Sequence, residues 1–280
     1  MRACSVMLQA RFYFSKPNRR NQYFHTSNFS KMKTAFITGA TSGIGRATAT
    51  LLAKNGFQIV ACGRRVKRLE ELKTELEAFT KVHLLSFDVR NKEEVCAAID
   101  SLPEECRNID LLINNAGNAH GLSSIQNGTI DDWDAMIDIN VKGLLYVSKA
   151  IIPNMIERNS GHIINIGSIA GREVYPNGNV YCASKYAVDA INSGMRMDLN
   201  EYNIRISQVA PGLVETEFSL VRFKGDTNKS QSVYEGYDAL KPEDIADLIM
   251  FIATRPAHVN LADVLILPSS QASSTMVKKN

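Results

Sequence analysis

The chain lacks the side-chain groupings that would mark a metalloprotein or a disulfide scaffold. Its five cysteines stand apart, with no CxxC pair and no cluster of histidine and cysteine. This argues against a zinc site and a disulfide framework and suits a reducing compartment. We therefore expect no bound metal and a cytoplasmic location. Cys182, beside Tyr181, has two interpretations, a redox-sensitive thiol or a small buried filler, and the second is simpler.

Long apolar runs and a strong net charge are also missing. No run approaches the 18 or so residues that a membrane-spanning helix needs. The formal net charge is only +3, and residues 1–31 supply this excess because they contain arginine and lysine but no Asp or Glu. The remainder is slightly acidic, so we expect neither a nucleic-acid surface nor a membrane partner.

The basic segment 1–31 has two interpretations. It resembles a mitochondrial transit peptide, but Met32 directly precedes the first expected strand, which favours a non-native or mis-assigned start. We treat 1–31 as a disordered or non-native extension. Residues 32–280 contain no Pro/Gly/Ser-rich linker, so we expect them to form one domain.

From residue 33 onward, short apolar runs alternate with helical periodicity. The expected strands are 34–38, 57–62, 82–87, 111–114, 162–166, 204–209 and 264–267. The expected helices are 45–54, 66–79, 92–101, 131–157, 180–201 and 242–254. Continuous Val/Ile/Leu runs are typical of parallel strands buried on both faces. The alternation predicts an α/β fold with a doubly wound parallel sheet, and the polar stretch 218–236 predicts a binding loop or lid.

A glycine-rich turn follows the first expected strand. Gly39, Thr41, Ser42, Gly43, Ile44 and Gly45 belong to a GxxxGxG spacing that opens a helix. Such a turn brings backbone close to a pyrophosphate and points a helix N-terminus at it. A plain strand-to-helix turn is the alternative, and its place after the first strand favours a dinucleotide site.

The end of the second expected strand indicates which dinucleotide. An acidic residue there would bind the ribose 2′-hydroxyl of NAD, but Arg64 and Arg65 stand in its place. A guanidinium pairs well with a 2′-phosphate, so the sequence predicts NADP. Asp88, followed by Val89, either accepts from the adenine amino group or caps a helix.

Tyr181 and Lys185 are four residues apart in an expected helix, and they therefore share one face. An ammonium beside a phenol lowers the tyrosine pKa from its ordinary value of about 10. Such a tyrosine can exchange a proton with an alcohol near neutral pH. Alone, the pair would be interpreted as an exposed surface contact.

The set of motifs resembles the short-chain dehydrogenase/reductase family across nearly all of residues 33–270. The motifs are Thr38–Gly45, Asn114-Asn115-Ala116-Gly117, Asn140, Ser168, Tyr181-x-x-x-Lys185 and Pro211-Gly212. The resemblance implies a Rossmann-type sheet of seven parallel strands. It also implies four catalytic residues: Tyr181 as acid/base, Lys185 as its electrostatic partner and ribose ligand, Ser168 holding the reacting oxygen, and Asn140 anchoring a water relay toward Lys185.

The resemblance implies further cofactor contacts. They are Asn115, Gly117, Pro211, Gly212, Val214 and Thr216, together with Tyr181 and Lys185. Four stretches, including Ser160–Ser168 and Thr216–Asp226, look like the bacterial NADP-dependent 3-hydroxy acid dehydrogenases, also described as serine or allo-threonine dehydrogenases. That branch implies a homotetramer acting on L-serine, allo-threonine or 3-hydroxypropionate, whose oxidised form is malonic semialdehyde.

A 3-hydroxy acid carries a carboxylate, which calls for a basic partner. Arg222 and Lys224 are candidates for binding it, although solvated loop charges are an equal alternative. We place Arg222, Ser168 and Tyr181 at the substrate, and His120 and Tyr175 near it. Other 3-oxoacyl or carbonyl reductases of the same family and a non-catalytic NADP sensor remain alternatives. The intact Tyr181 and Lys185 count against the sensor.

Overall fold

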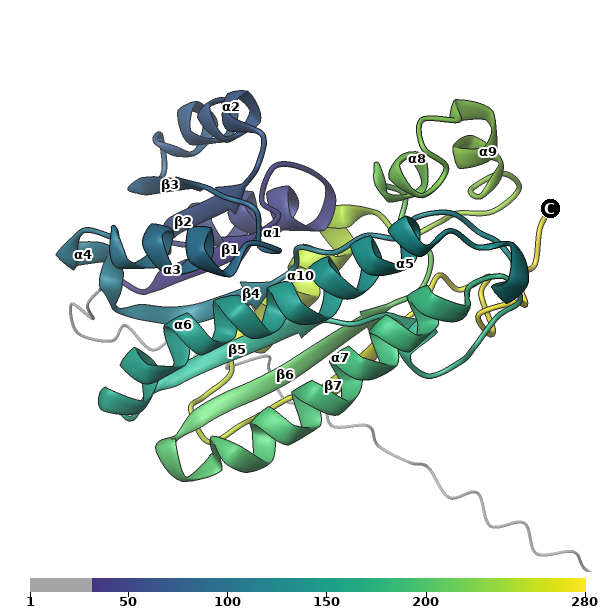
Figure 1. The fold of residues 1–280 in the computed structure, drawn as a ribbon. Helices are drawn as coiled ribbons and strands as arrows, with labels where there is room; N and C mark the ends of the chain where they lie inside the picture. The colour runs from purple at the N-terminus through teal and green to yellow at the C-terminus, as the bar shows by residue number, and fades with distance from the viewer. Residues whose placement is uncertain (1–31) are drawn as a thin grey trace, which may run out of the picture. The chain divides into compact units, whose positions relative to one another are not determined.

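Seven strands of the computed structural model form one parallel sheet in the order β3-β2-β1-β4-β5-β6-β7 (Figure 1). The strands are β1 Thr34–Thr38, β2 Gln58–Gly63, β3 Val82–Ser86, β4 Ile109–Asn114, β5 Gly161–Ile166, β6 Ile204–Pro211 and β7 Asp263–Ile266. The structure describes residues 32–280, and the predictions made for residues 1–31 lie outside the described residues. The predicted doubly wound parallel sheet is confirmed, since all its strand pairings are parallel.

Helices cover both faces of the sheet. They are α1 Gly43–Lys54, α2 Val66–Leu76, α3 Lys92–Asp100, α4 Glu104–Arg107, α5 Ile130–Ile137, α6 Gly143–Glu157, α7 Asn179–Asp198, α8 Phe218–Arg222, α9 Thr227–Ser232 and α10 Pro242–Ala253. Figure 1 shows α5, α6 and α7 on the near face and α1 and α10 behind the sheet.

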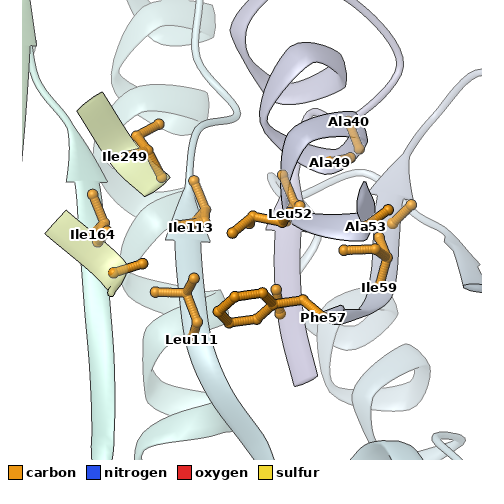
Figure 2. Packing of buried hydrophobic residues seen from close by; sticks show 14 of the residues in the cluster. Ala40, Ala49, Leu52, Ala53, Phe57, Ile59, Leu111, Ile113, Ile164 and Ile249 are labelled. Carbon is orange, nitrogen blue, oxygen red and sulfur yellow. The ribbon is translucent and has the colours of Figure 1, made fainter. Parts of the chain in front are cut away.

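Two apolar clusters explain why the central strands are almost wholly apolar. One cluster packs Leu52 of α1 and Ile249 of α10 against Ile113 and Ile164 of the sheet (Figure 2). The other packs α3 and α6 against the opposite face. Each strand therefore buries both of its faces, as a parallel sheet between two helical layers requires.

The strand order places a crevice beside β1 and β4. These neighbouring strands lead to helices on opposite faces, so the loops after them diverge. In open α/β sheets, ligands bind in the crevice outside the carboxyl ends of the strands at this point. The glycine turn after β1 and Asn115–Gly117 after β4 both lie at that edge.

Three local predictions differ from the structure. The helix expected over 131–157 is interrupted at Asp138–Lys142 by a π-helical turn, η2, which separates α5 from α6. The stretch 218–236 is not wholly irregular, because it contains α8 and α9; Figure 1 shows them as a pair set apart from the helices on the sheet. Helix α4 was not predicted at all. Helices of four to six residues are too short for an apolar period to reveal.

Within residues 32–280, no helix has the length and apolar character needed to cross a membrane.

Candidate active site

A cavity of about 440 Å³ opens at the carboxyl edge of the sheet. It extends from the arginines after β2 to the tyrosine of α7, so one space joins the expected adenine and nicotinamide ends. Its lining includes the predicted residues Gly39, Thr41, Ser42, Gly43, Ile44, Arg64, Arg65, Asp88, Val89, Asn115, Gly117, Ser168, Tyr181, Lys185, Pro211, Gly212, Val214, Thr216 and Arg222.

The glycine turn fits a closely approaching ligand. Gly39 and Gly43 have φ values of +67° and +51°, which side chains rarely adopt. Gly45 differs from the expectation because it does not line the cavity. A Cβ on Gly45 would lie 2.3 Å from the carbonyl oxygen of Gly39. Gly45 therefore lets α1 start tightly against the turn, as the third glycine of a dinucleotide fingerprint does.

The two arginines after β2 are held by carboxylates. Arg64 is 3.3 Å from Asp88. Arg65 donates from Nη2 to the hydroxyls of Thr41 and Ser42, both at 2.8 Å, so its guanidinium lies over the glycine turn. Burial acts to raise the pKa of Asp88, but hydrogen bonding and charge from Arg90, with Arg64, outweigh it and hold this pKa below its ordinary value. The carboxylate of Asp88 is thus an anchor for arginines.

Tyr181 is enclosed at the other end of the cavity. The ring of Phe218 meets it edge-on at a centroid distance of 5.6 Å. Burial raises the pKa of Tyr181 above its ordinary value, while the charge of Arg222 and a hydrogen bond with Ser168 act to lower it. The predicted lowering of this pKa by Lys185 is therefore wrong, because the positive charge that acts on the phenol is that of Arg222, and desolvation of the phenolate outweighs it.

Lys185 is buried and turned toward the sheet. Its ammonium donates to the carbonyl oxygen of Ile166 at 2.9 Å. Burial lowers the pKa of Lys185 to about 8, because its ammonium loses hydration inside the fold. Tyr181 and Lys185 both line the cavity from α7, and the exposed-pair interpretation of them is wrong.

Asn140 is buried in the π-turn and does not line the cavity. Its amide accepts from the backbone nitrogen of Asn118 and donates to the Asn118 carbonyl oxygen, both at 2.8 Å, and to Ser184 at 2.9 Å. These bonds tie α7 to the loop after β4. π-turns are frequent at functional sites, and here the widened turn aims one amide at two elements.

Arg222 is surrounded by aromatic rings. Its guanidinium carbon lies 4.9 Å from the ring centroid of Tyr181, 5.4 Å from that of Phe218 and 5.7 Å from that of Tyr175. The guanidinium donates to the Tyr175 hydroxyl. Its buried Nε has no hydrogen-bond partner among residues 32–280, and no carboxylate there forms an ion pair with Arg222. The side chain can therefore bind an anion beside Tyr181.

Two further candidates lie outside this cavity. Lys224 pairs with Asp132 at 2.9 Å, and His120 lines a separate small hollow beside Asp132. Tyr181 also lines that hollow, so the placement of His120 near the substrate stays a prediction, whereas the ion pair turns Lys224 toward α5. Tyr175, by contrast, does line the main cavity.

Sequence reasoning missed Phe218, Glu217 and two residues of the C-terminal segment, Gln271 and Ser274, all of which line the cavity. Gln271 accepts from the backbone nitrogen of Leu213 at 2.9 Å and so braces the loop after β6. The C-terminal segment has no local motif, and its position becomes apparent only from the fold.

Sheet order, glycine turn and cavity together define a Rossmann-type dinucleotide-binding protein. A family model described as short chain dehydrogenase matches residues 33–226, and the chain belongs to this family. The predicted family is therefore confirmed.

Similar proteins match nearly the whole described chain. An NADP-dependent 3-hydroxy acid dehydrogenase of Salmonella typhi is 46% identical over 237 residues, covering 84% of this chain and 95% of that protein. Sulfoacetaldehyde reductase 2 of Chromohalobacter salexigens is 44% identical over 239 residues, covering 85% and 95%. A solved structure of the closed form of serine dehydrogenase complexed with NADP+ has 42% identity and a TM-score of 0.84, covering 88% of this chain and 99% of that one.

Proposed function

We propose that this protein is an NADP-dependent dehydrogenase that acts on C3 of short 3-hydroxy acids, such as L-serine, allo-threonine and 3-hydroxypropionate. The observation that carries the proposal is the position of Arg222, a cation without a carboxylate partner in residues 32–280, stacked 4.9 Å from the ring of Tyr181. An acid bound there would present its hydroxyl to the phenol. The names of the 3-hydroxy acid and serine dehydrogenase relatives agree with this substrate class.

The cavity suits NADP at its opposite end. The glycine turn and its helix N-terminus would hold the pyrophosphate, with Asn115 and Gly117 beside the ribose and Pro211–Thr216 at the nicotinamide. Arg65 and Arg64 would hold the 2′-phosphate. Relatives that carry NADP in their names support the predicted cofactor. When bound, the nicotinamide accepts or donates the hydride.

The protein's own residues would move the proton. As the hydride leaves C3 of the alcohol, Tyr181 takes the hydroxyl proton, and in the reverse direction it returns that proton to the carbonyl oxygen. Ser168 would hold the reacting oxygen beside the phenol. Lys185 would place its charge near the ribose and the phenol. Asn140, bonded to Asn118 and Ser184, would position α7 for these steps.

Arg222 would then select acids over neutral alcohols. A guanidinium binds a planar carboxylate through two hydrogen bonds and also binds a sulfonate, so reduction of a short sulfonated aldehyde is a second candidate activity. The sulfoacetaldehyde reductase relative favours including it. A general carbonyl reductase would depend on Arg222 only through its effect on Tyr181 and would not select acids.

The test is a steady-state panel with NADP+ and NAD+ against L-serine, allo-threonine, 3-hydroxypropionate and propan-2-ol, with sulfoacetaldehyde in the reductive direction. We expect NADP+ to be preferred and acids to be turned over. Arg222→Gln should lower kcat/KM for every substrate, because the charge of Arg222 favours the Tyr181 phenolate. It should also raise KM for the acids at least tenfold, because only the acids lose a charge-assisted contact.

Lys224→Gln is the matched control. It removes a neighbouring positive charge that pairs with Asp132 outside the cavity, so acids and alcohols should be affected equally and weakly. Equal losses on acids and alcohols in Arg222→Gln would contradict the acid site. NADP+ binding with no turnover of any substrate would instead favour the sensor.

The expected homotetramer stays a proposal. Apolar area for subunit contacts is offered by Leu145 on α6 and by Tyr186 and Met197 on α7. These side chains are 40–73% exposed. We also propose that residues 32–280 act as one domain and that the enzyme works in the cytoplasm.

A further inference from the structure

The segment after β6 crosses above the glycine turn. A Cβ built on Gly43 would lie 3.2 Å from the Thr216 methyl group, so the two chain segments are in contact. The next residue, Glu217, reaches the arginines beyond the turn. Its carboxylate accepts from Arg65 at 2.9 Å and from Arg68 at 2.8 Å. We call these two ion pairs the Glu217 latch.

The latch joins opposite walls of the cavity. Arg65 directly precedes α2 and Arg68 lies in its first turn, on the side of the cavity that carries the predicted 2′-phosphate site. Glu217 directly precedes α8, which carries Phe218 and Arg222 against Tyr181. A single carboxylate therefore connects the adenine-ribose end to the two residues that enclose the phenol.

Arg68 distinguishes the latch from a simple phosphate site. Its Nη1 lies 2.8 Å from both oxygens of Glu217, yet Arg68 does not line the cavity, whereas Arg65 does. Arg65 can thus turn its donors to a phosphate while Arg68 keeps Glu217 in place. The hydrogen bond from Arg68, with that from Arg65, holds the pKa of Glu217 below its ordinary value, so the carboxylate is ionised throughout the neutral range.

We propose that Glu217 and Arg68 are positioning residues that fasten the α8–α9 segment over the bound dinucleotide and slow its release. This inference rests on the proposed NADP-dependent function for the identity of the ligand. The latch itself is a feature of the chain, so it is testable with and without cofactor. Its ion pairs are 37–44% exposed, which limits their strength and makes them sensitive to salt.

The test compares Glu217→Gln and Arg68→Gln with wild type. Stopped-flow displacement of bound NADPH by excess NADP+ should give release about fivefold faster in either variant, the scale of an exposed ion-pair network. The double variant should release no faster than Glu217→Gln, because that single variant already removes the contact with Arg68. Added NaCl should accelerate release from wild type toward the rate of the variants and affect the variants less.

The control is Lys67→Gln, which removes a positive charge from the same helix without breaking the latch. Simple attraction of the anionic cofactor predicts opposite effects for Glu217→Gln and Arg68→Gln, and a similar effect for Arg68→Gln and Lys67→Gln. The latch predicts faster release for Glu217→Gln and Arg68→Gln and unchanged release for Lys67→Gln. Release unchanged in both, or slower in Glu217→Gln, would overturn the proposal.

Amide hydrogen exchange of the cofactor-free protein separates the latch from the proposed function. Residues 216–232 should exchange faster in Glu217→Gln and Arg68→Gln than in wild type and Lys67→Gln. If wild type fails to bind NADPH, the proposed cofactor is wrong, and the exchange result alone decides whether the segment is fastened. Identical exchange in all four proteins would overturn the latch.

Discussion

Tyr181 lies between opposing electrostatic effects. Burial disfavours its phenolate, whereas Arg222 and Ser168 favour it. Arg222 stacks on the ring and donates to Tyr175, so the cation that would bind the substrate also lowers the cost of charging the phenol. In the proposed function, one arginine would couple the choice of substrate to proton transfer, and a substrate carboxylate would partly cancel its effect on the phenol.

Replacing Tyr181 by Phe tests the proton transfer. The variant keeps the ring against Phe218 and Arg222 but removes the hydroxyl, so turnover should fall at least a thousandfold, the scale of lost acid/base catalysis. NADPH affinity, followed by fluorescence titration, should stay within about threefold. Tyr186→Phe, an exposed position on the same helix, should retain full activity. Substantial turnover by Tyr181→Phe would remove the phenol from the mechanism.

At the scale of elements, the site is built where short loops leave parallel strands. The turn after β1 is tight because Gly39 and Gly43 adopt positive φ and Gly45 lies against the Gly39 carbonyl. The loop after β4 is fixed on it, since Asn115 donates to the carbonyl oxygens of Thr38 and Gly39. Backbone packing, more than side-chain chemistry, therefore sets the shape of the cofactor end.

Gly45→Ala should damage this packing. The added methyl group would lie 2.3 Å from a carbonyl oxygen and 2.5 Å from the Asn115 amide, so the start of α1 must shift. We expect a loss of about 1–3 kcal/mol in unfolding free energy and NADPH binding at least tenfold weaker. Thr50→Ala on the same helix, where one long hydrogen bond to Glu75 is lost, should change both little. Equal behaviour of the two variants in denaturation and titration would disprove the packing role.

The sequence predicted the elements whose signals are local. Apolar runs located β1 to β7 within a few residues, and the GxxxGxG spacing located the turn. It could not predict the π-turn at Asn140, because that turn depends on partners 22 and 44 residues away. Nor could it separate Arg222 from Lys224: the aromatic rings around one and the Asp132 partner of the other come from distant segments.

At the scale of the whole molecule, the sheet has two ends with different tasks. The carboxyl ends of its strands form the cavity, while His162 lies near the amino end of β5 in a buried polar chain. His162 Nε2 is 2.9 Å from the Ser207 hydroxyl, which donates to Asn260 at 3.1 Å. These bonds connect β5, β6 and the segment before β7. The histidine is thus a stability element remote from the chemistry.

His162 should make stability depend on pH. Burial, with the charges of Arg205 and Lys33, lowers its pKa to about 3 in the folded state, against about 6.5 in an unfolded chain. Between these two pKa values His162 is protonated in the unfolded chain but neutral in the folded chain. Stability therefore falls as pH falls from 6.5 toward 3. The free energy of unfolding therefore falls by up to about 1.4 kcal/mol per pH unit. The total loss from pH 8 to pH 5 is about 2 kcal/mol.

Urea denaturation of wild type and His162→Gln at pH 8 and pH 5, at one protein concentration, measures this contribution. The variant loses packing and is expected to be less stable at pH 8, but it cannot take up the proton. The difference between the two proteins should therefore shrink by about 2 kcal/mol at pH 5. Because carboxylates paired with arginine, such as Asp88 and Glu217, titrate equally in both proteins, their contribution cancels in this difference. If the two proteins differ in unfolding free energy by the same amount at both pH values, the buried imidazole accepts its proton in the folded state. The Ser207–Asn260 chain would then reorganise around the charge.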